Sequence, residues 1–353
     1  MNTDSGRARY HALARQHMRL VPVCVLALTA SGLLSDSGVG VGAISERLQQ
    51  QAPSVAQTAG VFEQAPANAV FVRGMYAYVA VGSRLVIVDV SDRARPRVIG
   101  QTMALPDLAQ DVNVADHFAY VAAGDAGLWV VDISDSSSPS VVGTYDTPGF
   151  ASGVQIDGTY AYVADGWAGL QVVDVSNPAT PTALGHCAAT GRARAVRVAG
   201  NYAYVAAEEE GLRVVDVSDP AAPALVGAYS TSGDVNDVAI VGNLAYLAAG
   251  GGGIEVVDVT HPTAPRQIGA YAPPYGKSIY VADGHAYLAT ERSGLWIIDL
   301  SDSTAPFAVS SFSTIQSAND VYVDGGYAFV ATGRSGFRVI DVSNPAVPVA
   351  VDQ

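Results

Sequence analysis

The sequence predicts an all-β fold, a seven-bladed β-propeller in which each blade is a four-stranded antiparallel sheet. One observation behind this prediction is the phrase LVIVDVSD at Leu85–Asp92, which recurs in six close variants along the chain. Another is an aromatic residue in a Tyr-Val-Ala-like context that recurs every 42 or 41 residues, at Tyr78, Tyr120, Tyr162, Tyr204, Tyr246, Tyr287 and Phe329. Self-similarity at a fixed period is the signature of a repeat architecture, so seven copies predict seven blades.

The repeat at residues 151–192 shows why each unit is expected to be one blade. Its β-like runs are residues 153–157, 159–164, 169–175 and 181–187. Val, Ile, Tyr and Leu dominate these runs, and Gly, Asp, Asn, Ser and Pro separate them. Four strands in a unit of about 40 residues are typical of a propeller blade, because solenoid coils use shorter units with fewer strands. Runs such as YVA are apolar on both faces, which suits blades that stack face to face around an axis.

The two ends of the repeat array suggest how the ring closes. Residues 58–70 align with residues 226–238, so the stretch near 54–63 resembles an outer, fourth strand without the rest of its blade. The chain end, PAVPVAVDQ, is a shortened version of the same strand. We expect the N-terminal segment to pair in the last blade and latch the ring, with about 1 kcal/mol net per hydrogen bond. In the alternative interpretation, residues 44–66 form a disordered linker.

Residues 1–43 have the pattern of a secretory signal peptide. Four arginines (Arg7, Arg9, Arg15 and Arg19) precede the apolar run 20–34, and small residues at Val41-Gly42-Ala43 offer a cleavage site. The apolar run is shorter than the roughly 20 residues that span a bilayer. The sequence therefore predicts a secreted, cell-surface or periplasmic protein with no membrane span in the mature chain, residues 67–353 forming the propeller. An uncleaved anchor is the alternative.

Charge and motif content exclude several functions. The chain of 353 residues has a formal net charge of −14, and nucleic-acid binding needs clustered positive charge. Phosphate-binding loops, metalloprotease motifs, nucleophile turns and metal-spaced Cys pairs do not occur in the sequence. We therefore expect a monomeric propeller with no cofactor, no resident metal and no catalytic residue. Cleavage would leave Cys187 alone, and a small residue at a strand end is the expected role for it.

One Asp in every repeat closes the predicted third strand: Asp89, Asp132, Asp174, Asp216, Asp258, Asp299 and Asp341. An apolar residue and Ser or Thr follow this Asp, and a Pro arrives soon afterwards. Asp and Ser at a strand end accept hydrogen bonds from backbone N–H groups of the following turn, so the repeated Asp is predicted to stabilise the scaffold. Calcium binding is the alternative, but the second acid of the phrase becomes Asn177, His261 and Asn344 in three copies.

The LVIVD phrase at Leu85–Asp89 and its six variants resemble the LVIVD repeat family. The resemblance covers residues 67–353 and implies a β-propeller from an exported or surface protein of bacteria or archaea. It also implies a role in binding or adhesion, and it transfers no catalytic residue.

Candidate binding residues lie where the repeats differ. In propellers, the loops between the second and third strands and those between blades share one face. On the first set of loops Trp167 is a candidate contact for a protein or a sugar ring, and Glu208, Glu209 and Glu210 form an acidic spot. Packing against its own blade is the other interpretation of Trp167.

Two further columns are expected to ring the mouth of the central channel. One reads Asn68, Gln110, Ser152, Arg194, Asn236, Lys277 and Asn319, and the next reads Ala69, Asp111, Gly153, Ala195, Asp237, Ser278 and Asp320. Either they line a water-filled pore, or Arg194, Lys277, Asp237 and Asp320 hold a small polar or glycan ligand. The favoured function is an exported binding or adhesion-type scaffold for a protein or glycan. The alternatives are an extracellular hydrolase or lyase with a channel-mouth site, and a structural envelope component.

Overall fold

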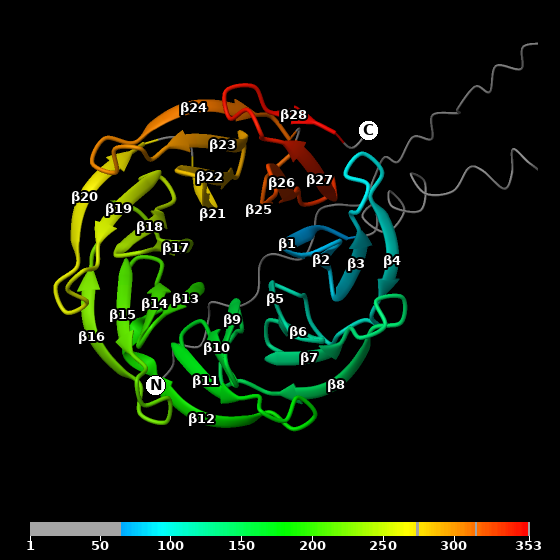
Figure 1. Ribbon diagram of the computed structural model, residues 1–353. Coiled ribbons are helices and arrows are strands. Elements are labelled where there is room, and N and C mark those ends of the chain that lie inside the picture. Colours follow the sequence, from blue (N-terminus) through cyan, green and yellow to red (C-terminus); the bar gives the residue numbers. More distant parts are fainter. Residues whose placement is uncertain (1–64, 273–274, 315, 352–353) are drawn as a thin grey trace, which may run out of the picture. The chain divides into compact units, whose positions relative to one another are not determined.

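The computed structural model describes residues 65–272, 275–314 and 316–351, all within one compact unit of the chain, residues 52–353. In this described part the chain forms seven four-stranded antiparallel sheets around a central axis, numbered here as blades 1 to 7 in chain order (Figure 1). The predicted seven-bladed all-β propeller is therefore confirmed. The predicted signal peptide, residues 1–43, and the predicted latch strand near 54–63 lie outside the described residues.

The first strand of each blade lies next to the axis, and the second pairs with its outer side (Figure 1). The first strands are β1 (Ala67–Arg73), β5 (Asp111–Ala115), β9 (Gly153–Asp157), β13 (Ala195–Ala199), β17 (Asp237–Val241), β21 (Gly276–Ala282) and β25 (Asp320–Asp324). The second strands are β2 (Tyr76–Val81), β6 (Phe118–Ala122), β10 (Tyr160–Ala164), β14 (Tyr202–Ala206), β18 (Leu244–Ala248), β22 (His285–Thr290) and β26 (Tyr327–Ala331).

The repeated LVIVD-like phrase forms the third strand, and the fourth strand lies on the outer wall (Figure 1). The third strands are β3 (Arg84–Asp89), β7 (Leu128–Asp132), β11 (Leu170–Asp174), β15 (Leu212–Asp216), β19 (Ile254–Asp258), β23 (Gly294–Asp299) and β27 (Phe337–Asp341). The fourth strands are β4 (Arg97–Gln101), β8 (Ser140–Tyr145), β12 (Thr182–Cys187), β16 (Ala224–Tyr229), β20 (Arg266–Tyr271), β24 (Phe307–Phe312) and β28 (Val349–Ala350). A single 3₁₀ turn, η1 (Ala188–Thr190), follows β12.

The hydrophobic core lies between neighbouring blades rather than at the axis. Between blades 3 and 4, for example, Leu170 and Val172 pack with Val196 and Val205. The two middle strands of a blade are buried almost throughout because both of their faces meet another blade, which is why these strands lack hydrophobic alternation. Cys187 belongs to the same cluster, buried at the end of β12 as a small strand-end residue.

A glycine in the outer strand lets the next blade approach closely. Gly185 in β12 stands opposite Val172, where the register with β11 shifts at a β-bulge. A Cβ atom added at Gly185 would overlap the carbonyl oxygen of Pro220 and lie 2.8 Å from Cδ of Pro223, both in the turn of blade 4. Equivalent glycines occupy the same place in four other blades of the described ring: Gly100, Gly143, Gly227 and Gly269. In blade 6 the position is Ser310, whose hydroxyl donates to the carbonyl of Pro345 at 2.5 Å.

The ring closes where blade 7 meets blade 1 (Figure 1). Ala67 and Gly333 exchange two backbone hydrogen bonds, with N···O distances of 2.9 and 3.2 Å. In the described residues the C-terminal strand β28 supplies the fourth strand of blade 7, pairing with Ile340 and Asp341. Within the same residues no helix is long and apolar enough to cross a bilayer.

Candidate functional site

The channel mouth is a cavity of about 690 Å³ on the face that carries the loops between blades. These loops contact the loops between second and third strands, as when the amide of Ala109 donates to the carbonyl of Gly82 at 2.8 Å. The structure brings the predicted columns together here: the cavity is lined by Asn68, Gln110, Ser152, Arg194, Asn236, Lys277 and Asn319, and also by Ala69, Asp111, Ala195, Asp237, Ser278 and Asp320.

Part of the outer polar column holds neighbouring blades together. The amide nitrogens of Asn68, Asn236 and Asn319 each donate to a backbone carbonyl of the next blade at 2.9 Å. Lys277 donates to Asn319 Oδ1 at 3.0 Å and to Ser317 Oγ at 3.2 Å. Burial lowers the pKa of Lys277, which the nearby Glu291 partly offsets. The side chains that remain available for a ligand at this level include Arg194.

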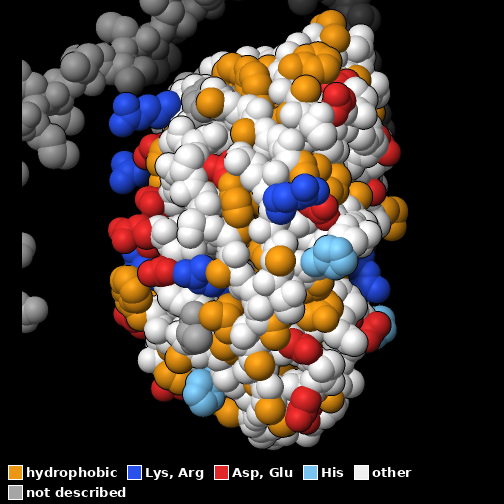
Figure 2. All heavy atoms as spheres, turned by 90° about the vertical axis from the view of Figure 1, so that its left-hand side faces the viewer, with side chains coloured by type: hydrophobic (Ala, Val, Ile, Leu, Met, Phe, Trp, Pro, Cys, Tyr) orange, Lys and Arg blue, Asp and Glu red, His pale blue; other side chains and the backbone are white. Residues whose placement is uncertain are grey.

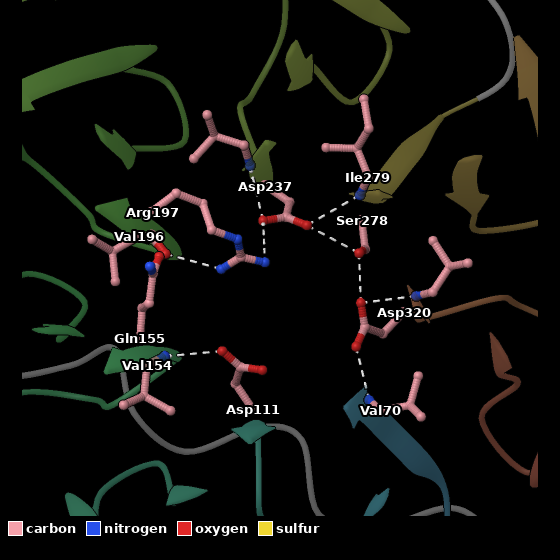
Figure 3. Close-up of polar contacts among 12 residues, drawn as sticks. Val70, Asp111, Val154, Gln155, Val196, Arg197, Asp237, Ser278, Ile279 and Asp320 are labelled. Atoms are coloured by element: carbon pink, nitrogen blue, oxygen red, sulfur yellow. Dashed lines mark hydrogen bonds and ion pairs between the residues drawn. The ribbon is translucent and has the colours of Figure 1, made fainter. Parts of the chain in front are cut away.

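The aspartates of the second column link one innermost strand to the next through hydrogen bonds. Asp111, Asp237 and Asp320 accept hydrogen bonds from backbone amides of the following blade, at 2.9, 3.0 and 2.8 Å (Figure 3). An innermost strand has no partner strand on its channel side, and a carboxylate supplies the acceptor that its amides need. Ser278 also donates to Asp237 and Asp320, at 3.0 and 2.6 Å. A structural role therefore accounts for much of this column.

Arg197 is the main channel residue that the sequence prediction missed. It lies on β13 and points into the channel towards Asp237, with an N···O distance of 3.5 Å (Figure 3). Its guanidinium also donates to the carbonyl of Val196 at 2.9 Å. Withdrawal from bulk water alone would lower the pKa of Arg197, but the negative charges of Asp237, Asp111 and Asp320 outweigh this effect and raise it.

Burial in the channel also shifts the pKa values of two carboxyl groups. Desolvation raises the pKa of Asp111 to about 6, against the opposing charge of Arg197. It raises the pKa of Asp320 to about 7, with the negative charge of Asp111 as the next cause. Asp111, Arg197 and Asp320 line the channel together, and this level is called the waist below. Carboxyl groups that titrate near neutral pH in a cavity are a recognised feature of functional sites.

Trp167 lies on the rim of the mouth and is 77% exposed. Packing against its own blade therefore does not hold it, and the guanidinium of Arg192 lies 5.9 Å from its ring centroid. Arg192 also pairs with Glu208 at 2.8 Å, and Arg194 approaches Glu208 at 3.4 Å. The rim beside Trp167 is thus a mixed cluster of one aromatic ring, two guanidinium groups and one carboxylate.

The predicted acidic spot carries less unpaired negative charge than its three carboxylates suggest. Glu208 is neutralised by the two arginines just described, and Glu210 pairs with Arg213. Glu209 alone of the three is exposed without an ion pair among the described residues. The sequence could not reveal this pairing because Arg192 and Glu208 belong to different loops that meet only in the folded ring.

Exposed hydrophobic side chains lie on loops of the face that carries the mouth. Met103 is 85% exposed, and Leu108, Phe150, Trp167 and Tyr275 also face solvent from loops of this face. Seen from the side, Arg, Lys, Asp and Glu side chains gather along one edge of the ring, and the outer wall carries scattered hydrophobic groups with several charged and His side chains among them (Figure 2). Exposed aromatic and Met side chains are enriched at protein interfaces.

The repeated aspartates lie away from the mouth, at the turns between third and fourth strands. In every repeat the Asp accepts the amide of the residue two positions later, at 2.7–2.9 Å: Asp89, Asp132, Asp174, Asp216, Asp258, Asp299 and Asp341. Hydrogen bonds from the hydroxyl and the backbone amide of this Ser or Thr lower the pKa of each repeated Asp. The repeated carboxylates therefore stabilise the turns between third and fourth strands.

Two solved structures have a fold similar to that of this protein. The propeller resembles the Cps50 (Swd1) β-propeller domain of Myceliophteria thermophila, with a TM-score of 0.66 and 10% identity over 79% of this chain and 96% of that one. It also resembles the computationally designed Ika8 protein, with a TM-score of 0.59 and 9% identity over 79% of this chain and 84% of that one. At these identities the likeness concerns the fold alone. The comparison with curated proteins gave no match.

The family assignment follows from the repeats themselves. The family model described as the LVIVD repeat matches residues 66–104, 108–147, 148–189, 190–231, 232–272, 275–314 and 316–353. The matched segments correspond one by one to the blades of the described ring. The chain therefore belongs to the LVIVD repeat family.

Proposed function

We propose that this protein is an exported, cell-surface or periplasmic binding scaffold, which engages a protein or glycan partner through the face around the channel mouth. The observation that carries the proposal is the exposure of Trp167, Phe150, Leu108 and Met103 on loops of the face that also holds a polar cavity. A large ring held in solvent lacks the burial that would compensate for its contact with water, and binding of a partner supplies that burial.

The charges of the rim fit a partner that combines apolar and polar contacts. Arg192 and Arg194 stand beside Trp167 and share one carboxylate, Glu208. Trp and Arg are enriched at binding hot spots, because an aromatic ring buries a large contact area and a guanidinium offers five N–H donors in a fixed plane. The export signal predicted for residues 1–43 supports a partner outside the cytoplasm.

The experiment is a binding screen with the full chain against glycan arrays and against a surface-protein fraction, with hits quantified by calorimetry. Trp167→Ala and Arg194→Ala should weaken binding of a true partner by about tenfold or more. Phe307→Ala is the matched control, because Phe307 is 53% exposed on the outer strand β24. Binding that falls equally in the control, or that survives both rim variants, would remove the mouth face from consideration.

A second candidate function is hydrolysis or elimination at the channel. The observation that favours it is the pair of carboxyl groups at the waist, with pKa values raised to about 6 for Asp111 and about 7 for Asp320. A general acid or base works best when its pKa lies near the working pH. Turnover of a glycoside or uronate polymer that Asp320→Asn abolishes would favour the enzyme, and turnover that persists in this variant would exclude the waist.

A further inference from the structure

Below the waist the channel holds a second cavity of about 320 Å³, distinct from the mouth. Asp111, Arg197 and Asp320 line both cavities, so the waist separates them. The lower cavity, called the lower chamber here, is lined by the next inward-facing column of the innermost strands: Phe71, Asn113, Gln155, Arg197, Ala239, Tyr280 and Tyr322. Its volume lies at the small end of the range for ligand pockets.

One wall of the lower chamber is aromatic. The rings of Phe71 and Tyr322 have centroids 5.1 Å apart, and those of Tyr322 and Tyr280 are 4.7 Å apart. These residues come from β1, β25 and β21 and are only partly buried. Burial, followed by the neighbouring Tyr280, raises the pKa of the Tyr322 phenol well above its usual range, so it stays a neutral hydroxyl. The wall thus offers ring faces and edges together with hydroxyl groups.

The wall across the ring is polar. The Oε1 atom of Gln155 accepts the backbone amide of Val198 at 2.8 Å, and its Nε2 atom donates to the Val198 carbonyl at 3.4 Å. The Oδ1 atom of Asn113, which also lines the chamber, accepts the amide of Ile156 at 3.3 Å, and within the described residues no hydrogen bond from its NH₂ group is present. A guanidinium has five N–H donors, and within the described residues Arg197 has contacts to Val196 and Asp237. Donors for a ligand therefore remain on this side.

The waist carries charge of both signs, because Arg197 lies beside Asp111, Asp320 and Asp237. An anion is repelled by the aspartates, and a cation must compete with Arg197 for them. A neutral ligand rich in hydroxyl groups avoids both penalties. Its hydroxyls can accept from the guanidinium and donate to the carboxylates, and an apolar ring face can pack on the aromatic wall.

We propose that the lower chamber is a second binding site and takes a neutral sugar unit. The sugar ring packs against Tyr280 and Tyr322, and its hydroxyl groups meet the waist at Arg197. This site is independent of the partner face around Trp167, because the waist lies between them.

The test is calorimetric titration of the full chain with glucose, galactose, mannose and N-acetylglucosamine, with choline and glucuronate as charged probes. We expect at least one neutral sugar to bind and both charged probes to bind more weakly. Ala239→Phe should fill the chamber and weaken sugar binding by about tenfold or more. Tyr322→Leu removes the stacking ring and gives the same result if Ala239→Phe does not fold, as judged by circular dichroism.

Phe307→Ala is the matched control, because it removes an exposed ring from the outer strand β24 and leaves the lower chamber intact. Sugar binding that is unchanged in this control and lost in the chamber variants supports the site. The proposal is overturned if no neutral sugar binds, if a charged probe binds more tightly, or if the chamber variants bind like the wild type. Loss of sugar binding in Trp167→Ala would overturn it too and would assign the sugar to the mouth face instead.

Discussion

The substitution Gly185→Ala tests how closely the blades must approach one another. The added Cβ would lie 2.8 Å from Cδ of Pro223 and 3.0 Å from the carbonyl carbon of Ala221, and it would overlap the carbonyl oxygen of Pro220. Ordinary van der Waals contacts of a Cβ begin near 3.4 Å, so the turn of blade 4 must move by at least a few tenths of an ångström. A proline ring and backbone atoms cannot rotate away as a flexible side chain would.

The expected cost of Gly185→Ala is about 1–3 kcal/mol, the usual range for overpacking a well-packed interior. Ser310 shows that a Cβ is accommodated at the equivalent place in blade 6 when its hydroxyl compensates with a hydrogen bond to Pro345, so a larger penalty is not expected. With an unfolding entropy of about 2.1 cal/mol/K per residue, a propeller of this size loses roughly 1.5–2 °C in the melting temperature per kcal/mol.

The assay is urea unfolding followed by circular dichroism, with Gly251→Ala as the matched control. A Cβ at Gly251 would meet nothing within 4 Å, so that variant should stay within about 0.5 kcal/mol of the wild type. If Gly185→Ala were as stable as Gly251→Ala, close blade contact would not be the reason for glycine at this position, and the packing argument for the other outer-strand glycines would fail with it.

Three further outcomes are expected. Asp320 has its pKa raised to about 7, so between about pH 4 and 7 the folded chain holds a proton that the unfolded chain has released. Stability therefore falls as pH rises through that window, and Asp320→Asn should flatten the slope of the urea midpoint against pH; an unchanged slope would contradict the raised pKa. Asp174→Ala should lower the melting temperature more than Asp174→Asn, since an amide oxygen can still accept the amide of Ser176, and equal losses would argue against the turn hydrogen bond. Glu255 is 2% exposed and accepts from the Tyr229 hydroxyl at 2.7 Å, so Glu255→Ala should cost about 1–3 kcal/mol in urea unfolding by stranding buried donors, and a neutral result would show that water replaces the carboxylate.

The fold could be predicted because its information is local and repeated. Apart from the two-residue β28, the strands of the described blades are five to seven residues long, and the repeats share similar turn residues and nearly the same period, so errors in one repeat are corrected by the others. The closing latch is different, since it depends on one unrepeated stretch near 54–63 that lies outside the described residues. Repetition supplies no second copy against which that prediction can be compared.

The candidate site could be predicted only in part. Arg194 and Lys277 were placed at the mouth from their register, because one position per repeat must line the axis. Arg197 was missed although it lies two residues beyond Ala195, and alternate residues of a strand share a face. Its column mixes Phe, Asn, Gln, Arg, Ala and Tyr, so no common chemistry marked it. The ion pair between Arg192 and Glu208 forms because two loops meet in the folded ring. The spacing of the two residues in the sequence does not reveal this contact.

The junction between blade 7 and blade 1 uses the same pair of backbone hydrogen bonds as three other junctions of the described ring, those between blades 2 and 3, 3 and 4, and 4 and 5: 2.9 and 3.2 Å at Ala67 and Gly333, for example, and 2.9 and 3.2 Å at Ala193 and Gly166. The junction that closes the ring is therefore bonded like these internal junctions. A circular permutant that joins the array's ends and opens instead between blades 3 and 4 should assemble the same channel, mouth and waist. The binding face therefore depends on the closed ring and not on which blade comes first in the chain.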